Sequence, residues 1–257
     1  MKKKVKTIAG LALSLSLLPF TATGWAGEAV SALNGKLETI YGAIDNNESK
    51  AAQASLDAPL AKNIGLQLDG LVGEISPEHI DGVGGHFFWR DSELGLLGVT
   101  GSWVEQGGWH VNRAAVEGEY YHRRLTAGVQ AGYQSGDIND SGFGSLNLSY
   151  YPMDDLMLGI SGGLSGSNSR LAVTAEYQTP LPGLTVFVKA ATGNDDYDQI
   201  LGGIRYYFGG KKSLIQRHRQ DEPPNRLLDS LTDNQRRDPA PAPDPTPVPA
   251  PSPALLI

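Results

Sequence analysis

Cysteine is absent from the 257 residues. Disulfides and thiolate metal sites are thereby excluded, so a secreted form of the chain has to be held by a large core or by lipid. A long apolar run is also missing, because after Ala26 no uninterrupted stretch approaches the roughly 20 residues that a spanning helix needs. These two absences exclude a disulfide-stapled domain and a helical membrane protein.

Positive charge is scarce beyond the N-terminus. The chain has 21 Lys and Arg against 28 Asp and Glu, a formal net charge of −7 at pH 7. Four lysines near the start precede an apolar stretch from Ile8 to Phe20, and small residues follow up to Ala26. This order is typical of a secretory signal over 1–26, cleaved after Ala26; an uncleaved anchor, the alternative, would be short for a span. Cleavage changes the formal charge from −7 to −11, which disfavours nucleic-acid binding.

Alternation of apolar and polar residues dominates between residues 35 and 208. In one clear case Leu125, Val129 and Tyr133 share a face, and the residues on the other face are Thr, Gly and Gln. A period of two that turn residues interrupt at regular intervals predicts β-strands. Twelve candidate strands follow, near 36–44, 50–60, 64–75, 82–90, 94–105, 109–121, 124–135, 143–152, 156–166, 170–180, 184–193 and 199–208.

The predicted fold class is all-β, an antiparallel transmembrane barrel of about twelve strands within 27–208, followed by a tail outside the barrel. Three of the strands alternate imperfectly, so a count of ten is the alternative. An even count puts both barrel ends on one side of the membrane. The connections sort into short turns on that side, such as His122-Arg123, and an opposite set richer in Gly and acidic residues, such as Gly136–Ser141.

The aromatic residues indicate which face of the sheet points outward. One group lies near the short turns and a second near the opposite end, while mid-strand apolar positions are mostly aliphatic. Two aromatic girdles around an aliphatic band fit a bilayer, whereas a soluble barrel, the alternative, has no reason to separate its rings. The first girdle comprises Phe87, Trp89, Tyr120, Tyr150, Tyr177, Tyr206 and Phe208, and the second Tyr41, Trp103, Trp109, Tyr133 and Phe143.

The polar face then lines the interior. It carries charges of both signs, which need partners when they are removed from bulk water. Because many inward positions are Gly, Ser, Thr or Ala, the sequence favours a narrow pore over a lumen shut by salt bridges. The residues predicted to line the lumen are Asp69, His86, Arg90, Arg113, Glu117, Glu119, Glu176, Lys189 and Arg205.

The last predicted strand carries a motif. Gly203, Tyr206 and Phe208 have the spacing of glycine, aromatic and terminal aromatic that resembles the terminal-strand signal of Gram-negative outer-membrane barrels. Leu201 stands where that pattern has a polar residue. The resemblance is to the porin-like class as a whole. It implies location in the cell outer membrane, with the barrel-assembly machinery, outer-membrane lipid and lipopolysaccharide as partners.

The predicted function is a narrow passive channel for small polar solutes or ions. No connection opposite the chain ends exceeds about eight residues, so none is expected to fold into the barrel as a plug, and gating would fall to inward side chains. The alternative is a closed structural barrel that anchors its tail to peptidoglycan or a periplasmic protein.

A lipid-modifying enzyme is a further alternative with little support. His110 has a suitable height beside Ser102 on a neighbouring strand, but Ser102 is expected to face inward and no flanking motif supports a Ser–His pair. No His pair has ligand spacing, so neither a metal nor a cofactor is predicted. The chain is not expected to be an enzyme, and no catalytic residue is assigned.

Residues 209–257 depart from the alternation. The stretch 209–238 is basic with interspersed leucines, and two short helices are predicted on either side of Pro223-Pro224. Over 239–257 proline recurs at every second residue as far as Pro253, which favours an extended polyproline rod. By topology the whole tail is expected in the periplasm, either as a spacer toward a partner or as an extension without one.

Overall fold

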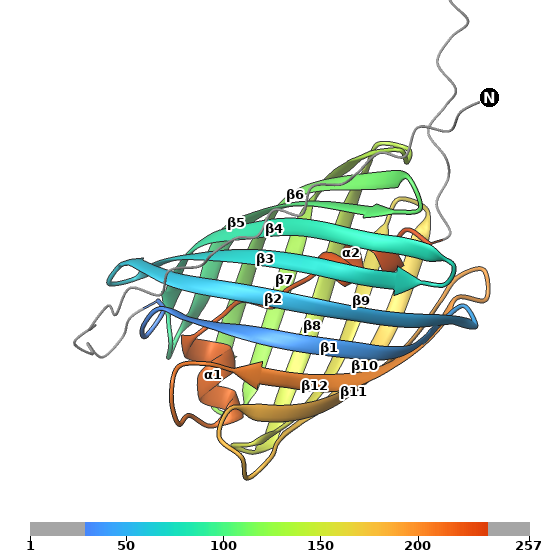
Figure 1. The fold of residues 1–257 in the computed structure, drawn as a ribbon. Coiled ribbons are helices and arrows are strands. Elements are labelled where there is room, and N and C mark those ends of the chain that lie inside the picture. Colours follow the sequence, from blue (N-terminus) through green and yellow to red (C-terminus); the bar gives the residue numbers. More distant parts are fainter. Residues whose placement is uncertain (1–28, 236–257) are drawn as a thin grey trace, which may run out of the picture.

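The computed structural model describes residues 29–235. The predicted signal peptide and the proline-rich stretch lie outside these residues. Figure 1 shows that the described chain forms a single ring of strands.

All twelve predicted strands are present, and they close into one antiparallel barrel in which each strand pairs with its neighbour in sequence and β1 pairs with β12. The all-β prediction with twelve strands is therefore confirmed. The strands are β1 (Asn34–Ile44), β2 (Asn47–Ala61), β3 (Ile64–Ile75), β4 (Glu78–Asp91), β5 (Gly95–Gln106), β6 (Trp109–His122), β7 (Leu125–Gly136), β8 (Ser141–Met153), β9 (Leu156–Ser165), β10 (Asn168–Gln178), β11 (Leu184–Gly193) and β12 (Asp198–Tyr207).

Both chain ends of the barrel lie on one side, where β1 begins and β12 ends, and we call this side the terminal end. The other side, the loop end, carries the turns that follow the odd-numbered strands. Local sequence explains the tightness of these turns. Asp45 and Asn46 both adopt positive φ, 49° and 62°, which suits a two-residue hairpin and which Asp and Asn tolerate better than most residues.

The strand register is continuous apart from two shifts. One lies between Pro59 and Ala61 in β2, where proline has no N–H to donate to the ladder, and the other between Tyr150 and Met153 in β8. The strands that alternate imperfectly in sequence, β1, β3 and β6, keep an unbroken register with both neighbours except where β3 faces the β2 bulge. Their irregular alternation comes from the contents of the lumen, described below.

The outer surface of the barrel is apolar. Leu97, Leu146 and Leu164 are each about two-thirds exposed, at 66%, 67% and 66%, and buried polar side chains such as Gln67 and Glu176 point inward. This is the reverse of a soluble barrel and is the arrangement of a transmembrane one. The predicted terminal-end girdle is confirmed, since all seven of its rings are exposed on the outside.

The second girdle is only partly correct. Tyr41 and Tyr133 are exposed on the outer surface, but Trp109 and Phe143 are buried inside the barrel, at 7% and 8% exposure. Trp109 belongs to the apolar cluster at the loop end, and the ring of Phe143 lies under the guanidinium of Arg113, 4.3 Å from ring centre to Cζ. Both rings have partners in the lumen, which explains why they do not face lipid.

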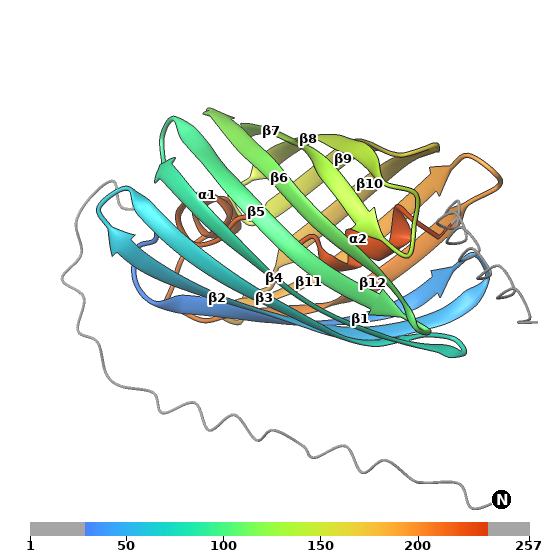
Figure 2. The same ribbon diagram turned by 90° about the horizontal axis from the view of Figure 1, so that it is seen from above.

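Two short helices follow the barrel, α1 (Leu214–Gln220) and α2 (Leu227–Thr232), as predicted on either side of Pro223-Pro224. Figure 2 shows both within the ring of strands, with α1 toward the terminal end and α2 toward the loop end. Neither described helix is long and apolar enough to cross a membrane. We call residues 209–235 the lumen segment, because the structure places them inside the barrel and not outside it as the sequence suggested.

Candidate functional site

The inward faces of β3, β4 and β6 bring three predicted lumen residues together. The imidazole of His86 lies between two carboxylates, with Nδ1 2.7 Å from Glu117 Oε1 and Nε2 3.0 Å from Asp69 Oδ2. Asp69 also accepts hydrogen bonds from Ser55 and Gln67 at 2.7 and 2.8 Å. The three side chains thus satisfy one another within the wall, as buried charges require.

A second group forms where the barrel closes. Arg205 on β12 pairs with Glu38 on β1 and with Glu176 on β10, and its guanidinium lies 4.0 Å from the ring centre of Phe187. Glu176 also accepts hydrogen bonds from other residues, including Thr185 on β11 at 2.7 Å. These contacts span the β1–β12 seam and therefore tie the first strand to the last ones.

Two further predicted cations reach across the lumen to the segment inside it. Lys189 pairs with Asp229 of α2, and Arg113 lies 3.1 Å from Asp233. Arg170, which the sequence analysis did not select, contacts both carboxylates, at 3.2 and 2.8 Å. The lumen segment therefore supplies the carboxylates that neutralise the loop-end cations of the wall.

The remaining two predicted lumen residues lie near the terminal end. Arg90 is fully buried, donates to the carbonyl of Ala29 at 3.2 Å and lies over the ring of Phe88. Glu119 accepts a hydrogen bond from the hydroxyl of Tyr121 at 2.8 Å. All nine residues predicted to line the lumen thus face inward, although most of them meet protein groups and not an open passage.

At the terminal end, α1 is fixed by side chains of the strands. Its first turn is closed by a capping box between Ser213 and Gln216. Leu214 packs into a cluster with Tyr151, Met157 and Tyr207, which lie on three inward strand faces. The helix therefore packs against the inner wall at this end.

His218 of α1 links several of these groups. It shares hydrogen bonds with the hydroxyls of Tyr151 and Tyr207 at 2.9 and 3.2 Å, and its Nε2 lies 3.6 Å from Glu176. These partners come from β8, β12 and β10, so one side chain of α1 bridges much of the wall near the seam.

Near the loop end, α2 contributes leucines to an apolar cluster. Leu227, Leu228 and Leu231 are buried, and Leu231 has no exposed surface. The helix contacts β3, β4, β5 and β6, whose inward residues we call the packed wall. Its apolar members are Leu71, Ile75, Ile80, Val104, Trp109 and Val111.

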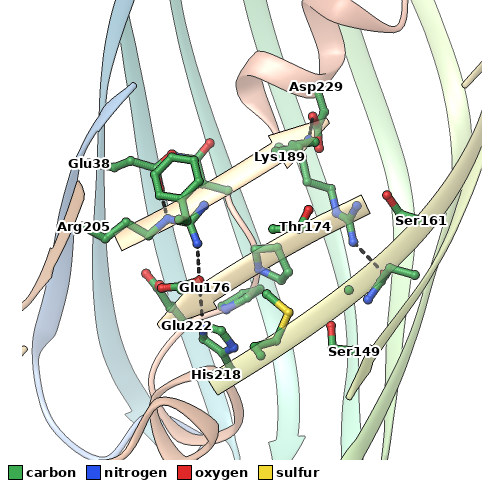
Figure 3. Close-up of a pocket in the computed structure, with 18 of the residues that line it drawn as sticks. Glu38, Ser149, Ser161, Thr174, Glu176, Lys189, Arg205, His218, Glu222 and Asp229 are labelled. Atoms are coloured by element: carbon green, nitrogen blue, oxygen red, sulfur yellow. Dashed lines mark hydrogen bonds and ion pairs between the residues drawn. The ribbon is translucent and has the colours of Figure 1, made fainter. Parts of the chain in front are cut away.

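The opposite side of the lumen segment is less filled. A cavity of about 210 Å³ remains there, lined mainly by the segment and by residues of β1, β2 and β8–β12. We call the inward residues of β8–β10 the open wall. Figure 3 shows Ser149, Ser161 and Thr174 on this wall, with Glu176, Arg205 and Lys189 around the same space. Several side chains of the open wall, such as Ser149, Ser161 and Thr174, are small and polar, so water and small polar solutes fit the chemistry of this part of the cavity.

One sequence-based expectation needs correction here. The barrel is filled by the chain after β12 and not by a strand connection. The stretch 209–238 was read as a basic periplasmic segment, yet its acidic residues Asp229 and Asp233 and its leucines are what hold 209–235 inside. The signal that could have found this placement is the match between these acids and the cations of the wall, which need partners when they are removed from water.

The residues considered for an enzyme do not form a site together. His110 pairs with Asp137 at 2.6 Å, whereas Ser102 lies opposite Arg113, three residues further along β6. Within residues 29–235 no group of three or more His, Asp or Glu side chains could hold a metal ion.

The predicted assembly motif lies at the terminal end of β12. Tyr206 and Phe208 face outward with their rings edge to face, 5.1 Å apart. Gly203 has a structural reason of its own, because a Cβ there would come within 1.9 Å of the carbonyl oxygen of Thr39 and 2.8 Å of the Phe187 ring. Glycine at this position lets the ring support Arg205. A role in assembly stays a prediction.

No protein-family model matches the sequence, and no curated protein matches it significantly. Solved structures do resemble the fold. KdgM porin aligns with a TM-score of 0.55 at 11% identity over 68% of this chain and 99% of that one. The COG4313 outer membrane channel from Pseudomonas putida F1 gives 0.52 at 10% identity, over 75% and 99%. Omp33 from Acinetobacter baumannii gives 0.50 at 14%, over 68% and 98%. The chain thus has the fold of outer-membrane β-barrel proteins of the small porin and channel type.

Proposed function

We propose that this protein is an outer-membrane channel for small polar solutes or ions, and that its own lumen segment restricts the passage. The apolar outer surface with its terminal-end girdle supports placement in a bilayer. Both barrel ends lie at the terminal end, and we take this end to face the periplasm, as in exported barrels. The loop end then faces the cell exterior.

The observation that carries the proposal is the cavity beside the lumen segment. Its lining includes small hydroxyl side chains on the open wall and charged side chains of both signs, among them the ion pair of Glu176 and Arg205. Charges of both signs around a narrow space orient water and admit small solutes in preference to large ones. The cavity lies on the side of the segment that faces β8–β10, so the proposed path for solutes passes these strands.

A closed barrel that serves as an anchor is the second candidate. It is favoured by the packing of α2, whose leucines and carboxylates fill the loop-end half of the lumen. In this case the barrel would conduct nothing, and its purpose would lie in the chain that follows the lumen segment.

Planar-bilayer conductance distinguishes the two candidates. We expect residues 27–257 to give small discrete steps, and the full-length double variant Asp229→Asn with Asp233→Asn to give larger ones, because α2 loses its ion pairs. The variant should also shift toward anion selectivity, since Arg113, Arg170 and Lys189 lose their carboxylate partners.

A variant that lacks 209–257 is the more severe test. We expect several-fold larger steps from it, provided that heat-dependent migration on gels confirms a folded barrel. If both variants insert correctly and stay silent, the channel proposal fails and the anchor takes its place.

A further inference from the structure

The lumen segment begins at the terminal end. It leaves β12 at Gly209, where a Cβ would lie 3.1 Å from the side chain of Asn34, the first residue of β1. The guanidinium of Arg219 in α1 donates to the carbonyls of Arg123 and Leu125 at 2.8 and 2.7 Å. These two residues belong to the β6–β7 turn region, so α1 is held at the same end as the barrel termini.

Beyond α1 the chain advances along the barrel. Glu222 pairs with Lys36 near the start of β1 at 2.9 Å, and both side chains are almost fully buried, at 4% and 6% exposure. Asn225 then reaches Ser55 in the middle of β2, at 3.5 Å. The intervening prolines cannot continue a helix, which favours an extended chain between α1 and α2. The chain therefore moves away from the terminal end.

The last described residues lie at the loop end. Asn234 exchanges hydrogen bonds with Gln134, close to the end of β7, at 3.0 and 3.2 Å. Gln235 donates from Nε2 to Gln106 Oε1 at 2.7 Å, and Gln106 is the last residue of β5 before the loop-end turn at Gly107. The lumen segment thus passes from one end of the barrel to the other, as Figure 2 shows.

The space beside the segment is too small for the chain to turn back. The cavity along the open wall has a volume of about 210 Å³. It corresponds to about seven water molecules at their share of liquid volume. A second strand of chain from the loop end back to the terminal end would need the full length of the lumen.

We infer that the barrel threads its own C-terminus, so that the residues after Gln235 emerge from the loop end and are displayed on the cell surface. Asp229 of α2 and Asp233, which directly follows the helix, pair with Lys189 and Arg113 and hold the chain in this exit position. Surface display rests on the membrane orientation given under the proposed function. Threading itself rests only on the contacts within the barrel. The function inferred is delivery of the proline-rich tail outside the cell.

Threading can be tested without reference to the membrane. The chain has no cysteine, so the pair Gln106→Cys with Gln235→Cys is the only possible thiol pair in that variant. We expect a disulfide or a short bis-maleimide bridge to form within the folded barrel, detected by mass spectrometry after proteolysis. The matched control, Glu93→Cys with Gln235→Cys, places the first thiol at the terminal end and should give no bridge.

Display is tested by thiol labelling of intact Gram-negative cells with a membrane-impermeant maleimide. Ser252→Cys reports on the tail in the full chain, Asp140→Cys on the loop end and Glu93→Cys on the terminal end, the last two being exposed positions. We expect Ser252→Cys and Asp140→Cys to label in intact cells, and Glu93→Cys only after permeabilisation.

Each other outcome overturns a defined part of the inference. Absence of the 106–235 bridge overturns threading. A bridge with Ser252→Cys labelled only after permeabilisation overturns display, as does labelling of Glu93→Cys in place of Asp140→Cys, which would reverse the orientation. A bridge and surface labelling together with a silent bilayer recording would leave display standing and refute the channel alone.

Discussion

The lumen segment lies between two unlike walls. On the packed wall, β3–β6 present Leu71, Val104 and other apolar residues that close around the leucines of α2. On the open wall, β8–β10 present Ser149, Ser161 and Thr174 to a cavity. Both walls belong to the same regular sheet, so the difference comes only from side-chain size and polarity. A plug fixed along one wall can therefore coexist with a passage along the other.

The largest expected effect comes from the packed wall. Leu231→Ala removes a side chain with no exposed surface, and we expect the free energy for opening α2 to fall by about 2–5 kcal/mol, because a cavity replaces its contacts. Hydrogen exchange of the α2 amides, followed by mass spectrometry, measures this opening. Ser161→Ala on the open wall is the matched control and should leave the exchange unchanged. Equal effects from both variants would contradict the contrast between the walls.

The ion pairs near α2 should come next. In Asp233→Asn, Arg113 and Arg170 lose a charged acceptor, and we expect α2 opening to become easier by about 1.5–3 kcal/mol. The same exchange measurement applies. An unchanged rate would mean that the leucines alone hold α2. Because Asp229 still neutralises Arg170 and Lys189 in this variant, the change should be smaller than in the double variant used for conductance.

On the open wall the expected effect is on conductance and not on stability. Ser161→Trp places an indole in the cavity, and we expect the unit conductance to fall several-fold while the free energy for opening α2 changes by less than about 1 kcal/mol, since the space already exists. Leu158→Trp is the control, because Leu158 lies three residues before Ser161 on the same strand, faces outward and does not line the cavity. If both variants conduct equally, the solute path does not follow β8–β10.

The smallest effect is expected on the outer face of the strands. Lys50 and Glu74 pair at 3.4 Å with side chains 58% and 39% exposed. Lys50→Ala should change the free energy of unfolding in detergent micelles by no more than about 0.5 kcal/mol, because exposed pairs are worth little. If Lys50→Ala destabilised the protein as much as Asp233→Asn, exposed ion pairs on the outer face and ion pairs in the lumen would contribute equally, which would contradict the difference described here.

Much of the barrel was predictable because period-two alternation is a local signal. All twelve strands and the inward side of residues such as Arg113 and Glu176 follow from it. The same parity would also have placed Trp109 inside, since it lies four residues before Arg113 on one strand, and Phe143 likewise four residues before Asn147. In these two cases the position near the end of the strand predicts a ring that faces lipid, whereas the alternation predicts a ring that faces the lumen. The structure agrees with the alternation.

The lumen segment was not predictable in the same way. Its helices are short, and their positions depend on partners distant in sequence, such as Arg113 for Asp233 and Lys36 for Glu222. Nothing within 209–235 alone distinguishes a chain lying in a lumen from one lying outside it. The segment could have been placed correctly from the need of the buried wall cations Arg113, Arg170 and Lys189 for carboxylate partners.

The lumen segment lies inside a barrel that closes at the β1–β12 seam, and this has a consequence for the order of assembly. If the barrel closed before the lumen segment entered it, α2 would have to pass the site of α1 and of the buried aromatic cluster at the terminal end. If the barrel closes around a lumen segment that is already in place, this passage is avoided. Arg205 on β12 then pairs with Glu38 and Glu176 when β12 joins β1. We expect wall and filling to form in one cooperative step, so that a barrel caught before seam closure would still be open to its own C-terminus.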